Sequence, residues 1–118
     1  PLAVRDPSVQ EFESWQEASG GLVRIVTLAP ERPGALEFIR HITSGGVVAA
    51  LGHTAADPLL IREAVAAGAR VSTHLGNGLA STIHRHENPL WEQIAADGLV
   101  ASLIGDGHHL PAAFVHCY

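Results

Sequence analysis

Two histidines of the sequence stand directly after short apolar runs. His53 follows the run 47–52 and His74 follows the run 70–73, and the segment 57–68 between them has a helix start, an apolar stripe and a final glycine. This order predicts a strand, a helix and a second strand. Parallel strands of α/β proteins carry their chemistry at their carboxyl ends. Two neutral imidazoles there can share a divalent metal, so we expect His53 and His74 to be ligands, with ordinary backbone-bonded histidines as the alternative.

Further candidate residues lie in the glycine-rich segments that follow the expected strands. Asn77 and Gly78 belong to a turn in which backbone amides and a carboxamide can approach a ligand, although an ordinary turn asparagine is an equal alternative. Arg85 lies in a long loop and suits a phosphate or carboxylate, or else is simply solvated. Asp106 can act as a base or a supporting partner, or form a turn. Asp106 and His109 share a segment that adds a further histidine to this edge.

The elements that must position these residues alternate between helix and strand. Strands are expected at 22–28, 47–51, 70–73 and 99–104. Helices are expected from Ser8 to about Gly20, from Pro33 to about Gly45, at 57–67 and at 89–97, with one more beginning at Pro111. Strands that are apolar on both faces and separated by helices predict a parallel sheet covered on both sides. Right-handed crossovers then bring every carboxyl end to one edge.

The composition limits the classes of function. The chain has 118 residues, 47% of them hydrophobic, which predicts one folded domain rather than a disordered segment. Its net charge is -5 and all seven of its cations are arginines, which argues against nucleic acid as a partner. The sequence shows neither an apolar run of about 20 residues nor a signal-peptide pattern, so we expect no membrane partner and a cytoplasmic location.

Three segments of the sequence carry a family resemblance: Leu51-Gly52-His53-Thr54, Thr73-His74-Leu75-Gly76-Asn77 and Asp106-Gly107-His108-His109. Together they resemble the N-acetylglucosamine-6-phosphate deacetylases of the amidohydrolase superfamily. In that family a G-H-[ST], a T-H-L-x-N and a D-G-x-H segment close successive barrel strands. Order and spacing both match, from about Asp6 to Phe114. The resemblance implies an α/β fold that is about half of a (β/α)8 barrel, with residues 1–118 forming a single segment of the barrel domain.

The resemblance also implies a reaction and roles for residues. The reaction is hydrolysis of the N-acetyl group of N-acetylglucosamine 6-phosphate to acetate and glucosamine 6-phosphate, with a divalent metal held by His53 and His74. Zinc is the first choice of metal, and iron, cobalt or manganese are alternatives. The substrate contacts implied are Asn77, Gly78, Arg85, Asp106 and His109, with Arg85 suited to the 6-phosphate. The full-length family enzyme is expected to be a homodimer.

The sequence departs from the family at two points. It has no E-G-P segment, which carries the third metal ligand, and no T-D-A segment, which carries the catalytic aspartate. We therefore expect no catalytic residue within the chain, the missing parts of the barrel to lie on both sides of it, and the isolated chain to be inactive. Two other functions stay open: a small α/β domain that binds a phosphate or another ligand without catalysis, and an amidohydrolase that acts on a different amide.

Overall fold

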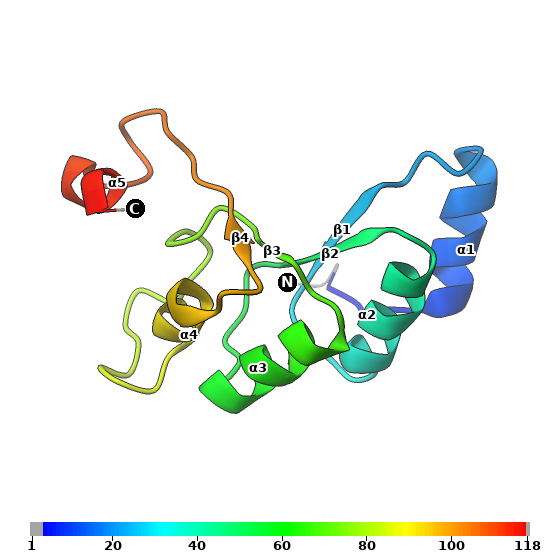
Figure 1. Ribbon diagram of the computed structural model, residues 1–118, viewed down its shortest axis with the longest axis horizontal. Coiled ribbons are helices and arrows are strands. Elements are labelled where there is room, and N and C mark those ends of the chain that lie inside the picture. The colour runs from blue at the N-terminus through cyan, green and yellow to red at the C-terminus, as the bar shows by residue number, and fades with distance from the viewer. Residues whose placement is uncertain (1–3, 118) are drawn as a thin grey trace.

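The computed structural model of the chain describes residues 4–117 and alternates helices with strands (Figure 1). The elements, in chain order, are α1 (Val9–Ala18), β1 (Ile25–Leu28), α2 (Ala35–Ser44), β2 (Val48–Leu51), α3 (Pro58–Ala67), β3 (Val71–Ser72), α4 (Pro89–Ala95), β4 (Val100–Ala101) and α5 (Ala112–Cys117). None of the helices in the described range is both long and apolar enough to cross a bilayer.

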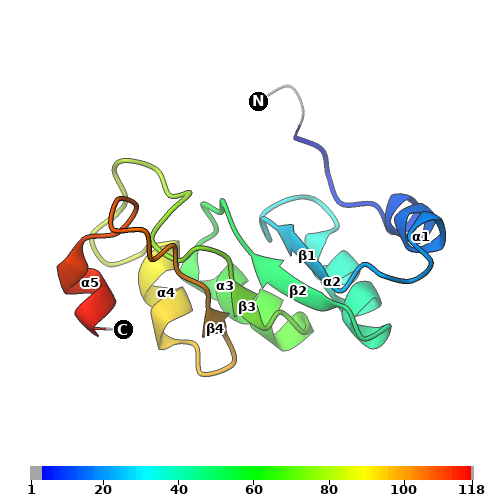
Figure 2. The ribbon, with the colours of Figure 1, turned by 90° about the horizontal axis from the view of Figure 1, so that it is seen from above.

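The four strands form one parallel sheet in the order β1-β2-β3-β4. Each strand therefore pairs with the next one along the chain, and every connection between them runs through a helix. In Figure 2 the loops that leave the strands rise on one side of the sheet, as parallel pairing requires. The expected α/β class and the expected common edge are both confirmed.

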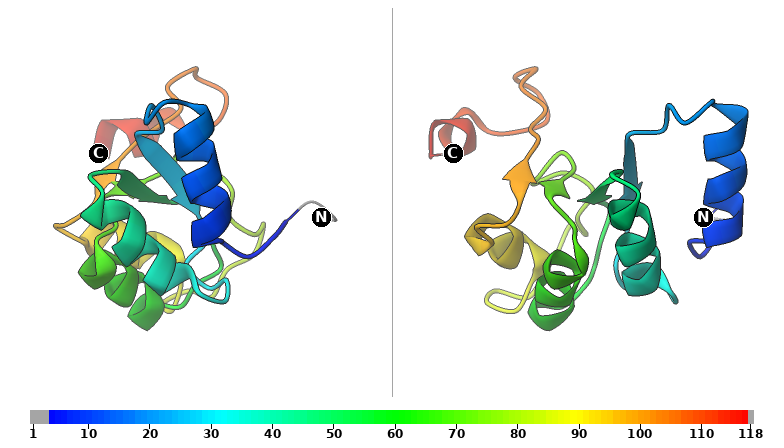
Figure 3. Two further views of the ribbon diagram at one scale, coloured as in Figure 1. Left: turned by 90° about the vertical axis from the view of Figure 1, so that its right-hand side faces the viewer. Right: turned by 45° about the vertical axis from the view of Figure 1, so that its right-hand side comes forward.

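The sheet is covered by helices on one face. Helix α3 packs between α2 and α4, and α1 stands beyond β1 at the edge of the sheet (Figure 3). The hydrophobic core between the sheet and these helices includes Phe38, Ile39 and Ile42 of α2, Ala49 and Leu51 of β2, and Ile61 and Ala64 of α3. Burial of such side chains stabilises the fold by about 1.5–3 kcal/mol for each large one.

The opposite face of the sheet is open, so the expectation of cover on both sides is wrong for the described residues. Ile25 is 54% exposed, Val48 37% and Val100 71%. In a barrel, that face looks inward and is covered by the strands opposite rather than by helices. The four strands bury the helix side, while on the opposite face Ala50 in the middle of β2 is buried and the three residues named above are exposed.

The strands are shorter than the apolar runs that predicted them. Strand β1 begins at Ile25 rather than at residue 22, and β4 contains only Val100 and Ala101 of the expected 99–104. A strand exists only where a neighbour supplies hydrogen bonds, and the pairing of β1 starts with Ile25 opposite Val48. Hydrophobicity extends past the ends of this ladder.

Three of the helices, α1, α3 and α4, begin at residues whose side chains cap them. Ser8 Oγ accepts a hydrogen bond from the amide of Glu11, and Asp57 Oδ1 accepts one from the amide of Leu60 at 2.8 Å. Both caps begin helices where they were expected. Asn88 caps α4 in the same way and donates through Nδ2 to the His84 carbonyl, so it also closes the preceding loop.

The sheet is sheared, and the shear can be read from two threonines. Thr27 pairs in register with Ala50, and Ala50 with Val71. The Thr27 hydroxyl nevertheless lies 3.0 Å from that of Thr73, which is two residues beyond Val71. The strands are thus offset by about one residue each, which is the stagger of an eight-stranded barrel of shear 8. The four strands have the order and the offset of a barrel segment.

The contact between these threonines passes over Gly52, which leads to a prediction. A Cβ on residue 52 would lie 2.7 Å from Thr27 Cγ2 and 3.0 Å from Thr73 Cβ. We expect Gly52→Ala to lower the free energy of unfolding by about 1–3 kcal/mol, because the added methyl overpacks the sheet. Urea denaturation measures this change.

Gly105→Ala is the matched control, since a Cβ there meets nothing within 4 Å and the residue is not among the glycines with positive φ. Its free energy of unfolding should stay within about 0.5 kcal/mol of the wild type. Equal effects of the two substitutions would contradict the proposed close packing at Gly52.

Candidate metal centre

His53 and His74 meet at the carboxyl ends of β2 and β3. Their Nε2 atoms lie 3.0 Å apart, and the two rings are nearly perpendicular, with an interplanar angle of 88°. His53 is exposed and His74 is half-buried. The two strands are neighbours in the sheet, so the residue that follows each strand reaches the same point of the rim. The predicted convergence of the two imidazoles is therefore present.

Both histidines have left-handed backbone conformations. The φ angle is 50° at His53 and 37° at His74, and these are the two non-glycine residues with positive φ in the described chain. Such a conformation costs about 1–3 kcal/mol for a residue with a side chain and is retained where its surroundings hold it. The left-handed backbone at His53 and at His74, which sets the direction of each imidazole, is thus held by contacts with other segments.

Ser102, just after β4, holds the backbone of His74. Its hydroxyl accepts a hydrogen bond from the His74 amide at 2.8 Å and donates to the Ser72 carbonyl at 3.2 Å. The Ser102 carbonyl accepts from the Leu75 amide at 2.9 Å. One serine thus connects the end of β3 to the strand beside it. The sequence analysis did not identify Ser102, because its partners lie about 30 residues earlier.

Glu31 holds the segment after His53. Its carboxylate accepts hydrogen bonds from the Thr54 hydroxyl and from the Ala55 amide. The sequence analysis also missed this residue, which lies in the loop between β1 and α2 and gave no signal of its own.

Gly78 closes over the two imidazoles. A Cβ at this position would lie 2.9 Å from His53 Nδ1 and 3.0 Å from His74 Cε1, and its φ is +71°. The residue therefore has to be glycine for two reasons, the left-handed backbone and the contact with both rings. The predicted role of Gly78 as a substrate contact stays a prediction.

The donor set fits a divalent metal. Two nitrogens 3.0 Å apart can both lie about 2.0–2.1 Å from one ion. Nδ1 of His74 is buried and has no hydrogen-bond partner among the described residues, so Nε2 is the ring nitrogen through which His74 acts. Within residues 4–117 no cluster of three or more His, Cys, Asp or Glu side chains could hold an ion. The pair thus supplies two of the three protein ligands typical of a catalytic site.

Of the other predicted site residues, Asn77 bonds to the backbone of His74, whereas Arg85 bonds to the start of α4. The Asn77 amide donates to the His74 carbonyl at 2.9 Å, while its buried Nδ2 has no partner among the described residues. Arg85 is exposed, and its carbonyl accepts from Trp91 Nε1 at 3.0 Å, which fixes the backbone but leaves the guanidinium in solvent. The turn at Asn77 is confirmed, and the substrate contact predicted for its carboxamide stays a prediction.

Asp106 and His109 form a pair of their own. Asp106 Oδ1 accepts from the amides of His108 at 2.9 Å and His109 at 3.0 Å, and Oδ2 lies 2.7 Å from His109 Nδ1. The two backbone amides, followed by the imidazole of His109, lower the pKa of Asp106 from 3.8 to about 2. The carboxylate therefore forms the turn and also orients the His109 ring.

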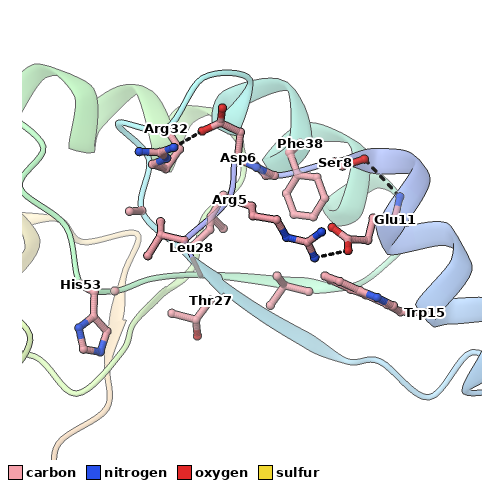
Figure 4. A pocket seen from close by; sticks show the side chains of 15 residues that line it. Arg5, Asp6, Ser8, Glu11, Trp15, Thr27, Leu28, Arg32, Phe38 and His53 are labelled. Carbon is pink, nitrogen blue, oxygen red and sulfur yellow. Dashed lines mark hydrogen bonds and ion pairs between the residues drawn. The ribbon is translucent and has the colours of Figure 1, made fainter. Parts of the chain in front are cut away.

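An open cavity of about 430 Å³ runs along the free edge of β1 and reaches His53. Its walls include Thr27 and Leu28 of β1, Phe38 of α2 and Trp15 of α1. Figure 4 shows His53 and Trp15 at opposite ends of the group of lining residues. The volume is in the range of small-molecule sites, so His53 borders a space large enough for a small ligand.

The bonds of Asp106 lead to a prediction about pH. Because the folded pKa lies below the ordinary value, the contribution of this turn to stability is present above about pH 3.8 and is lost as the pH falls through about 2. Carboxyl ¹³C NMR should place the Asp106 midpoint near 2, and the amide shifts of His108 and His109 should follow the same curve. In Asp106→Asn that transition should disappear from both amides, and a midpoint near 3.8 in the wild type would contradict the hydrogen bonds described.

Comparison with known proteins gives close relatives over nearly the whole chain. No family model matches it. The N-acetylglucosamine-6-phosphate deacetylase of Bacillus subtilis (strain 168) is 42% identical over 106 residues, which are 90% of this chain and 27% of that protein. The N-acetylgalactosamine-6-phosphate deacetylase of Escherichia coli O157:H7 is 36% identical over 118 residues, 99% of this chain and 31% of that protein.

The fold agrees with the sequence comparison. The structure of a variant N-acetyl-D-glucosamine-6-phosphate deacetylase from Mycobacterium smegmatis, in complex with N-acetyl-D-glucosamine-6-phosphate, superposes with a TM-score of 0.89 at 42% identity, covering 98% of this chain and 31% of that one. The chain thus spans about a third of the length of the relatives it matches. By sequence and by fold, it is homologous to a segment of the N-acetylglucosamine-6-phosphate deacetylases.

Proposed function

We propose that the chain forms part of a metal-dependent deacetylase that hydrolyses N-acetylglucosamine 6-phosphate to glucosamine 6-phosphate and acetate. The observation that carries the proposal is the 3.0 Å approach of the His53 and His74 Nε2 atoms at the rim of a parallel sheet. The relative of that name from Bacillus subtilis and the solved structure from Mycobacterium smegmatis are each 42% identical to this chain in sequence, which supports the substrate class. The 118 residues would then be a single segment of the barrel domain.

His53 and His74 would hold the metal through Nε2, with zinc as the first choice and iron, cobalt or manganese as alternatives. When bound, such an ion supplies Lewis-acid activation of water and of the amide carbonyl. Gly78 shields both rings from one side and so keeps the imidazoles in place. The third ligand and the catalytic aspartate would come from other parts of a longer protein, and we expect these 118 residues by themselves not to hydrolyse the amide.

The remaining residues would bind and orient the substrate. The carboxamide of Asn77 has an unpartnered buried nitrogen that can donate to a sugar hydroxyl or to the amide carbonyl. The exposed guanidinium of Arg85 suits a phosphate, which accepts two parallel hydrogen bonds from it. Asp106 binds Nδ1 of His109 and leaves Nε2 free to contact the amide or phosphate region.

A second candidate substrate has support of its own. The relative that aligns with 99% of the chain is named an N-acetylgalactosamine-6-phosphate deacetylase, at 36% identity. The two sugars differ only in the configuration of one hydroxyl, and the chemistry at the amide is the same. A cytoplasmic, homodimeric full-length enzyme fits the proposal, and neither nucleic acid nor a membrane has a part in it.

The metal site is tested by zinc titration of the metal-free chain. We expect the wild type to bind one ion, and His53→Asn and His74→Asn each to weaken binding by about tenfold or more, because each removes an imidazole ligand. Asparagine is chosen because it tolerates the left-handed backbone at both positions. Isothermal titration calorimetry gives stoichiometry and affinity.

The control for that titration is His84→Asn, which changes an exposed histidine of the loop before α4 and should leave zinc binding unchanged. Wild-type zinc affinity in either His53→Asn or His74→Asn would refute the shared site and would favour the alternative of a small domain that binds a phosphate without catalysis.

Recognition of the phosphate is tested through Arg85. We expect Arg85→Ala to weaken binding of N-acetylglucosamine 6-phosphate by about tenfold to a hundredfold, the value of one lost charge-assisted contact. Binding of unphosphorylated N-acetylglucosamine should not change. Ligand-observed NMR with both sugars and with the galactose epimer measures the three affinities. Arg40→Ala, which changes an exposed arginine of α2, is the control. If Arg85→Ala lost equal affinity for N-acetylglucosamine 6-phosphate and for N-acetylglucosamine, the role of Arg85 would be contradicted.

A further inference from the structure

The carboxylate of Glu31 ties the loop after β1 to the loop after β2. Oε2 accepts a hydrogen bond from Thr54 Oγ1 at 2.5 Å, and Oε1 accepts one from the Ala55 amide at 2.8 Å. Thr54 Oγ1 in turn accepts from the Ala56 amide at 3.0 Å. Thr54 itself is only 5% exposed. One carboxylate thus fixes three consecutive residues, which begin immediately after His53.

The residue before His53 is fixed as well. The Gly52 amide donates to the Leu28 carbonyl at 3.1 Å, and Gly52 is buried against the side chains of Thr27 and Thr73. The backbone of His53 therefore connects two segments that are each held by hydrogen bonds. Its left-handed φ of 50° is the conformation that joins them, so loss of the anchor on one side would let the backbone of His53 relax.

The loop that carries Glu31 is itself held firmly. The next residue, Arg32, forms an ion pair with Asp6 at 2.5 Å, and its carbonyl accepts from the Ala35 amide at 3.0 Å at the start of α2. A carboxylate on a fixed loop can impose a position on its partners, whereas one on a mobile loop would follow them. Glu31 thus lies on a loop that has contacts of its own, and from this loop its carboxylate reaches the residues after His53.

We propose that Glu31 is a positioning residue for His53, whose imidazole it holds toward His74 through Thr54 and Ala55. The importance of this role for metal binding rests on the proposed function. Both oxygens of Glu31 are used in these hydrogen bonds, so the residue acts through His53 and not as a ligand itself. Hydrogen bonds to a charged group contribute more than neutral ones, which suits an anchor that must hold a strained backbone.

A carboxylate suits these two donors better than a carboxamide does. The hydroxyl and the amide each donate to a different oxygen of Glu31, and glutamine offers only one oxygen. With glutamine the bond to Thr54 would have to reverse, with Nε2 donating to the remaining lone pair of Oγ1, and both bonds would lose their charged acceptor. Glu31→Gln thus keeps the size of the side chain and removes half of its acceptors and its charge.

The test compares Glu31→Gln with the wild type in the 118-residue chain, first without metal. We expect the Ala55 amide to lose protection from hydrogen exchange, the His53 ring signals to shift in ¹H–¹³C NMR spectra, and the signals of His84 to stay in place. Thr54→Val removes only the hydroxyl and should shift the His53 signals in the same direction. Glu63→Gln, an exposed glutamate of α3, is the matched control and should change none of them.

Zinc affinity is the second readout, measured by the same titration. We expect Glu31→Gln to weaken zinc binding about tenfold, as loss of a residue that supports a ligand does, and Glu63→Gln to leave it unchanged. Unaltered His53 signals in both Glu31→Gln and Thr54→Val would overturn the proposal, whatever the zinc affinity. If the wild type binds no zinc, the proposed function fails, while the His53 signals of the metal-free chain still decide whether Glu31 positions the ring.

Discussion

The contact of Thr27 with Thr73 across Gly52 determines how the rest of the rim is arranged. The two hydroxyls lie 3.0 Å apart although their strands are not neighbours, which requires a glycine on the strand between them. This close contact of the two side chains over Gly52 sets the offset between β1, β2 and β3. Strands β2 and β3 pair with Leu51 opposite Ser72, so His53 and His74, each two positions further on, lie side by side above the sheet.

The rim contains two residues with unfavourable backbone conformations, which hydrogen bonds from other segments stabilise. Two left-handed histidines cost about 1–3 kcal/mol each. Against this, Ser102 binds the backbone at His74 and Glu31 binds the residues after His53, through hydrogen bonds that contribute about 0.5–1.5 kcal/mol each, or more where the carboxylate takes part. The strain and its compensation come from different strands. A rim of this kind therefore forms only when neighbouring strand ends are in place.

Much of this arrangement follows from local sequence, and the part that does not has a common cause. His53 and His74 were identified because each ends an apolar run, and Ser8 and Asp57 because a cap precedes the helix that it starts. Glu31 and Ser102 were missed because their partners lie 23 to 30 residues away and are selected by the shear of the sheet. The strands were predicted too long because hydrophobicity reports burial, while the strand ends depend on pairing. Asn88 could have been found, since an asparagine before a proline is a helix-start signal.

The outer edges of β1 and β4 have a consequence for how this polypeptide associates with other chains. In the described chain each of these strands pairs on one side only, and Ile25 and Val100 stand exposed beside the unused hydrogen-bonding groups. Such edges are templates on which further strands assemble. Two copies of this chain can pair through such edges, because the free backbone groups of one strand match those of another. Cover of β1 and β4 is therefore a condition for keeping these residues monomeric at high concentration.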